Sequence, residues 1–173
     1  MDLLFETDRL LLRPLKITDA DDIFEMNNNP NVNRYLRNPI ETLSETKALI
    51  DKTRNEYSKN GIGRYAVILK ENNKLIGLSG LRFRDIEENG HSNFYDLGYR
   101  FSENYWRKGY AKEAALFWIH YGWNEMKLKT IYAYAESENT ASNSLLKVIG
   151  FTFENKYIAK DIEYNWYLLK NKL

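Results

Sequence analysis

The sequence contains no cysteine among its 173 residues. Disulfide bonds, zinc–thiolate sites and catalytic thiols are therefore excluded. Histidine is almost as scarce, with only His91 and His120 in the chain, so we expect no histidine-rich metal site and assign no metal ligands. We expect His91, in a polar stretch, to be solvated.

The sequence also lacks an excess of charge of either sign. It has 25 basic and 24 acidic residues, a net charge of +1, and no basic stripe that would suit a nucleic acid. No apolar run approaches the roughly 20 residues that a transmembrane helix needs. The first residues show no basic region followed by an apolar one, as a secretory signal would. We therefore expect a cytoplasmic protein without nucleic-acid or membrane partners.

What is present is an ordinary globular mixture, with 43% hydrophobic residues. The length suggests one domain over residues 1–173. Thr18 and Asp21 resemble a capping box at the start of a helix. Alternation, helical spacing and breaker residues predict an α/β (α+β) fold, with helices at about 18–26, 44–58, 109–122 and 140–149 and strands at about 9–14, 64–69, 75–83, 94–101, 129–135 and, as a final pair, within 151–169.

The junction between the strand at 94–101 and the following helix carries the clearest chemical signal. A helix N-terminus exposes unpaired N–H groups and a partial positive charge, which together favour a phosphate. Gly109 lets the backbone approach a ligand, and Arg107, Lys108 and Lys112 add positive charge. The pattern is neither a Walker loop nor a Rossmann fingerprint. Its spacing alone fits an ordinary turn before a helix equally well.

Three blocks resemble the GNAT superfamily in its RimJ/RimL-like form. YDLGYRFSENYWRKGYAKEA, at 95–114, resembles the cofactor-binding segment of those N-acetyltransferases, in which a strand and a short loop precede Y-W-G-K-G-Y-A-T-E-A. ETDRLLLRPL, at 6–15, resembles the family's start, and NTASNSLLKVIGF, at 139–151, resembles its late block. The blocks stand in family order. One departure is Arg107, which replaces the first glycine of W-G-K-G.

The resemblance implies the GNAT fold, a central mixed and mostly antiparallel sheet flanked by helices, and acetyl-CoA as cosubstrate. The cosubstrate would lie in a V-shaped gap between the strands at 94–101 and 129–135, with Asn139 hydrogen-bonded to its pantetheine arm. Pantetheine would pair with the backbone of Tyr99, Arg100 and Phe101. The amides that would bind the pyrophosphate are those of Arg107, Lys108, Gly109, Tyr110, Ala111 and Lys112.

The resemblance also implies transfer of the acetyl group to a primary amine. Since no thiol is available, direct attack by the amine in a ternary complex is the simplest route. Ser142 matches a hydroxyl near the CoA sulfur, or else a residue that caps its helix. Asp161 matches a base-like carboxylate, or else an aspartate of a hairpin turn. Asp96, which starts its strand, could act through water or position the substrate.

The acceptor amine is left open by the sequence. A protein N-terminus, an amino acid, a polyamine and an antibiotic amine all remain candidates, and a CoA- or peptide-binding module without turnover is the alternative function. The aromatic residues Phe94, Tyr95, Trp166 and Tyr167 could line an acceptor pocket or pack the sheet. A monomer and a homodimer are both compatible with the sequence.

Overall fold

The computed structural model describes residues 3–37 and 39–172, and all of its strands lie in one sheet. The eight strands are ordered β1-β2-β3-β4-β5-β6-β8-β7, and every neighbouring pair is antiparallel except β5 and β6. This confirms the expected mixed, mostly antiparallel sheet with flanking helices. The strands are β1 Phe5–Glu6, β2 Leu10–Arg13, β3 Arg64–Leu69, β4 Lys74–Arg84, β5 Phe94–Phe101, β6 Thr130–Glu136, β7 Thr152–Ala159 and β8 Ile162–Lys170.

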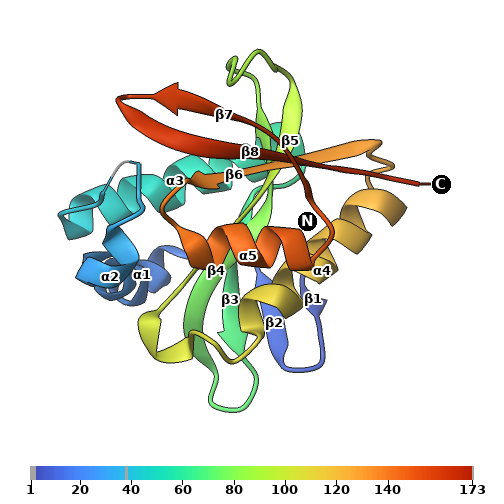
Figure 1. The fold of residues 1–173 in the computed structure, drawn as a ribbon. Helices are drawn as coiled ribbons and strands as arrows, with labels where there is room; N and C mark the ends of the chain where they lie inside the picture. Colours follow the sequence, from blue (N-terminus) through green and yellow to red (C-terminus); the bar gives the residue numbers. More distant parts are fainter. Residues whose placement is uncertain (1–2, 38, 173) are drawn as a thin grey trace.

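Helices cover both faces of this sheet (Figure 1). Alternation along the strands sends side chains to two separate apolar cores. One core packs α4 and α5 against one face, around Trp118, Leu97 and Ile131, and the other packs α1 and α3 against the opposite face, around Ile23 and Ile50. The helices are α1 Ala20–Asn28, α2 Pro30–Asn33, α3 Leu43–Asn60, α4 Tyr110–Asn124 and α5 Thr140–Val148, with short 3-10 turns at Ile17–Asp19 and Glu103–Tyr105.

The start of the first helix differs from the expected capping box. Thr18 lies inside a 3-10 turn, and no side chain caps α1. The Asp19 carboxylate instead accepts bonds of 2.7 Å from the Arg13 guanidinium and one of 2.8 Å from the Lys16 amide. The sequence pattern was misleading here because it paired Thr18 with Asp21, whereas the acidic residue that organises this turn is Asp19, which is held in an ion pair with Arg13.

A seam runs through the sheet between β5 and β6. These two parallel strands share a single register pair, Asp96 with Tyr132, whereas β4 and β5 are paired along the whole of β5. Because neighbouring parallel strands normally stay bonded along their length, the strands diverge beyond this pair toward their C-terminal ends. The divergence of the two backbones, called the gap below, matches the V shape that the family resemblance implied.

Candidate functional site

The loop that follows β5, at the end where β5 and β6 diverge, leads into α4. Gly109 is the N-cap of this helix, with φ of +83°, in the left-handed region that favours glycine. The first helical bond runs from the Glu113 amide to the Gly109 carbonyl, so the amides of Tyr110, Ala111 and Lys112 precede it and have no partner within the helix. Since glycine offers no side chain to cap them, these amides suit an anionic group.

Side chains from the N-terminal strand region fix this loop in place. The Glu113 carboxylate accepts bonds from the Thr7 hydroxyl at 2.6 Å and from the Arg9 side chain at 2.7 Å. Arg9 also donates to the Lys108 carbonyl at 2.9 Å and lies over the Tyr110 ring. Sequence reasoning missed the ion pair between Arg9 and Glu113, because nothing in the sequence marks two residues 104 positions apart as partners.

The family's first loop glycine falls on a position that has positive φ here. Arg107 has φ of +60°, in the same region as Gly109. A side chain in this conformation costs roughly 1 kcal/mol relative to glycine. Arg107, Lys108 and Lys112 are exposed, as side chains around an expected pyrophosphate would be.

The C-terminal half of β5 forms one wall of the gap. Tyr99, Arg100 and Phe101 pair with β4 on one edge, while none of them has a register partner in β6 on the other. An extended ligand can add to such an edge like a further strand. At the end of the wall, the Trp106 indole donates to the Phe101 carbonyl at 2.7 Å and so closes the short loop.

The opposite wall ends at the N-terminus of α5. Asn139 is the N-cap of this helix, and its side-chain oxygen accepts a bond from the Ser142 amide at 3.1 Å. The cap is therefore supplied by Asn139, which leaves the Ser142 hydroxyl free of that task. The Ser142 Oγ lies 3.1 Å from the hydroxyl of Tyr99, which reaches it from β5.

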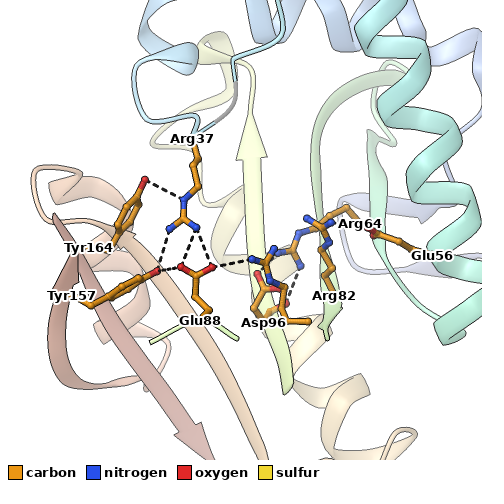
Figure 2. Close-up of polar contacts among 9 residues, drawn as sticks. Arg37, Glu56, Arg64, Arg82, Glu88, Asp96, Tyr157 and Tyr164 are labelled. Atoms are coloured by element: carbon orange, nitrogen blue, oxygen red, sulfur yellow. Dashed lines mark hydrogen bonds and ion pairs between the residues drawn. The ribbon is translucent and has the colours of Figure 1, made fainter. Parts of the chain in front are cut away.

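On the other face of the sheet, an ion pair lies at the narrow end of the gap (Figure 2). The Asp96 carboxylate, almost fully buried, accepts a bond of 2.5 Å from Arg64. The Arg64 guanidinium also bonds to the carbonyls of Gly80 and Asp96, and it occupies the space that a Cβ on Gly98 would need. Glycine at position 98 thus allows Arg64 to lie flat across β5.

A second polar cluster ties the segment before α3 to the C-terminal hairpin. Figure 2 shows Arg37 pointing at Tyr157, Tyr164 and Glu88. Its guanidinium donates to the Glu88 carboxylate at 3.0 Å and to the two tyrosine hydroxyls at 3.1 and 3.3 Å, and Glu88 also accepts from Arg84. Burial opposes the charge of Arg37, but the hydrogen bonds to Tyr164, Tyr157 and Glu88 outweigh it and raise the pKa of Arg37. The cluster was not foreseen from the sequence.

The aromatic residues that we expected near the acceptor separate onto two faces. Phe94 and Trp166 share one face with Tyr134 and His91, whereas Tyr95 and Tyr167 pack against the core on the α4 side. Strand alternation requires this division, since neighbouring residues point to opposite sides. The expectation of a solvated His91 was wrong: its ring is half-buried and stacked on Trp166 at 5.4 Å between centroids.

Arg100 combines a backbone at the gap with a side chain in the interior. Its guanidinium donates to the Asn27 side-chain oxygen at 2.5 Å, while its Nε is buried without a hydrogen-bond partner among the described residues. Burial, together with the nearby positive charge of Arg64, lowers the pKa of Arg100 to about 10.

The third sequence candidate for catalysis lies apart from the other two. Asp161 is exposed, with φ of +62°, in the turn Lys160–Asp161 between β7 and β8. Two residues of positive φ are typical of the tight turn that joins two antiparallel strands. The structure thus brings Ser142 to the gap, buries Asp96 at its narrow end, and places Asp161 at the tip of a hairpin.

Neither a candidate metal cluster nor a candidate membrane span is found in residues 3–37 and 39–172. Their histidine, aspartate and glutamate side chains form no group of three that could hold a metal ion. Within the same ranges, no helix is both long enough and apolar enough to span a bilayer.

Comparisons with known proteins agree with this architecture. A family model described as "Acetyltransferase (GNAT) domain" matches residues 9–152. An uncharacterized N-acetyltransferase, p20 of Bacillus licheniformis, is 33% identical over 86% of this chain and 82% of its own length. A GNAT-family acetyltransferase from Bacillus anthracis superposes with a TM-score of 0.81 at 26% identity, covering 97% of this chain and 98% of that one.

A more distant structure shares the fold alone. It is RimL, a ribosomal L7/L12 α-N-protein acetyltransferase solved with coenzyme A, with a TM-score of 0.77 at 16% identity over 97% of this chain and 98% of that one. The family match covers most of the chain, and the gap, the open strand edge and the uncapped amides are the parts that such a domain needs. The chain belongs to the GNAT family and is an acetyl-CoA-dependent N-acetyltransferase.

Proposed function

We propose that the chain transfers the acetyl group of acetyl-CoA to a primary amine by direct attack in a ternary complex, as a RimJ/RimL-like enzyme. The single observation that carries the proposal is the divergence of β5 from β6 beyond Asp96 and Tyr132. It leaves an open strand edge that runs from the sheet interior to the uncapped amides of α4. An extended ligand with a phosphate at one end fits such a site.

The cosubstrate would contact this chain at three places. The backbone of Tyr99, Arg100 and Phe101 would bind the pantetheine arm, and the loop and helix start from Arg107 to Lys112 would bind the pyrophosphate. Asn139 would add a hydrogen bond from its side-chain nitrogen, since its oxygen already caps α5. When bound, acetyl-CoA supplies an activated acyl group, and an N–H of the β5 edge would polarise its carbonyl.

The acceptor would approach from the face that carries Asp96 and Tyr134. On this face the buried Oδ1 of Asp96 has no hydrogen-bond partner among the described residues, so it can accept a bond from an incoming amine. Burial and the nearby charge of Asp96 raise the pKa of Tyr134, which keeps that hydroxyl neutral and able to donate. The neutral amine then forms the new N–C bond while the C–S bond breaks, with proximity supplying much of the rate.

The experiment that tests this proposal has two parts. Calorimetry with acetyl-CoA measures binding of the cosubstrate, and release of the free thiol across a panel of amines measures transfer. The panel should include N-terminal peptides, amino acids, polyamines and aminoglycosides. Absence of acetyl-CoA binding would contradict the placement of the cosubstrate. Binding without thiol release for any amine would instead support the alternative, a CoA-binding module without turnover.

A further inference from the structure

Two hydroxyl groups meet across the gap at its α4 and α5 side. The Tyr99 Oη lies 3.1 Å from the Ser142 Oγ and 3.4 Å from the Ser142 carbonyl oxygen. One residue belongs to the open half of β5 and the other to the first turn of α5. The pair therefore joins the two walls of the site that the proposed function assigns to acetyl-CoA.

Both partners are held in place by contacts on their own side. Alternation along β5 directs Tyr99 toward the core that contains α4 and α5. The Ser142 amide is fixed by the Asn139 cap, so the serine side chain projects from a defined turn. Because the cap uses the backbone of Ser142, its hydroxyl retains one hydrogen to donate and two lone pairs to accept.

Either hydroxyl can be the donor in the hydrogen bond between them. Burial raises the pKa of Tyr99 to about 12, so its hydroxyl keeps its proton at neutral pH and has one hydrogen to give. If that hydrogen is donated to the Ser142 Oγ, the hydrogen of the serine must point to a third atom. An anion in the gap is the partner that such a hydrogen favours most.

We propose that Tyr99 is a positioning residue, which donates to the Ser142 Oγ and thereby directs the serine hydrogen at the sulfur of the departing CoA. This deepens the proposed function and rests on it. During transfer the amine nitrogen bonds to the acetyl carbon, the C–S bond breaks, and its electron pair stays on sulfur. The Ser142 hydrogen bond stabilises this thiolate until sulfur takes up the proton that the amine loses to solvent.

The first test is a steady-state comparison of two tyrosines on the same strand and face. Tyr99→Phe should lower kcat about tenfold, because the hydrogen bond from Ser142 to the thiolate is weakened when the serine is no longer oriented, and change the KM for acetyl-CoA less than twofold. Tyr95→Phe is the matched control, because the Tyr95 hydroxyl makes no hydrogen bond to the described residues, and kcat should not change. Equal rates for both variants would overturn the proposal.

A double-mutant cycle separates positioning from a general loss of packing. Ser142→Ala should lower kcat, and adding Tyr99→Phe to it should cause little further loss, because the tyrosine acts through the serine. Ser142→Thr, which keeps the hydroxyl, should restore most of the rate only while Tyr99 is present. Losses that multiply in the double variant would contradict the coupling.

A last measurement needs no acceptor amine. The ultraviolet absorbance of the thiolate, followed against pH for CoA bound to the protein, reports how well the site stabilises that anion. Tyr99→Phe and Ser142→Ala should both raise the pKa of the bound thiol, and Tyr95→Phe should not. If wild-type protein binds CoA but acetylates no amine, the proposed function fails while this shift still tests the role of Tyr99. An unchanged thiol pKa in Tyr99→Phe would overturn that role by itself.

Discussion

Arg64 lies across β5 and holds Asp96 at the point where β5 and β6 part. The Arg64 side chain is 21% exposed and that of Asp96 5%, so the pair is largely removed from water. Removing one partner of such a pair leaves the other charge buried and uncompensated. The narrow end of the gap is thus built around a charge pair rather than around an apolar contact.

Asp96→Asn should lower the free energy of unfolding by about 3 kcal/mol for this reason. Denaturation in urea measures the change. Asp161→Asn is the matched control, because its carboxylate lies in an exposed turn where asparagine also tolerates positive φ, and its effect should stay within about 0.5 kcal/mol. Turnover of Asp161→Asn should equal that of the wild type. A large fall in kcat for this stable variant would instead identify Asp161 as the base.

Gly109→Asp should weaken binding of CoA by at least about tenfold. The new carboxylate would place negative charge beside the amides that the pyrophosphate is expected to use, and the residue must keep φ of +83°. Gly61→Asp controls for backbone strain, because Gly61 has φ of +73° and open space around it at the end of α3. Calorimetry with CoA should show normal affinity for Gly61→Asp. Equal affinities of the two variants for CoA would contradict the placement of the pyrophosphate at the start of α4.

Two substitutions at Asn139 separate its cap from its expected contact with pantetheine. Asn139→Ala removes the cap of α5 and should lower the free energy of unfolding by about 1 kcal/mol. Asn139→Asp keeps an oxygen that accepts from the Ser142 amide but loses the side-chain N–H donor. Its free energy of unfolding should therefore match that of the wild type, while its affinity for CoA should stay below that of the wild type. Thermal unfolding and calorimetry together give both quantities. Full affinity in Asn139→Asp would limit the residue to capping.

Stability in alkali should depend on Tyr99. Burial raises the pKa of Tyr99 from 10.0 to about 12, so the folded protein holds this proton more tightly than the unfolded chain does. The resulting stabilisation is fully present below pH 10 and is lost as the pH rises through 12. Wild type should therefore lose stability relative to Tyr99→Phe across this interval, as measured by urea denaturation at each pH. If the free energy of unfolding of the two proteins changed with pH in parallel, Tyr99 would not titrate in this way.

Much of the fold could be predicted from sequence because local signals and tertiary structure agree. The strands at 64–69 and 94–101 match β3 and β5, and the Lys160–Asp161 turn falls where the last hairpin was expected. The two-residue strand β1 and the four-residue helix α2 were missed, because such short elements depend on neighbours rather than on periodicity. The GNAT superfamily was identified from three blocks and is confirmed.

The site was less predictable from the sequence than the fold. Gly109 was visible because a helix start with positive φ has a local sequence signal. Arg37, Arg64 and Arg9 were not, since each meets its acidic partner from a separate part of the chain. A long charged side chain looks the same in sequence whether it is solvated or fixed in an ion pair, so such partners become visible only in three dimensions.

The single pair that joins β5 to β6 has a mechanical consequence. Strands β1 to β5 form one continuous ladder and β6 to β8 another, so little backbone bonding resists a force that pulls the two ladders apart. A ligand bound along the β5 edge would form contacts with both sets of strands and so hold them together. We therefore expect the amides of Ala133 to Glu136 that face the seam to exchange with deuterium faster than their neighbours in the free protein, and more slowly once CoA is bound.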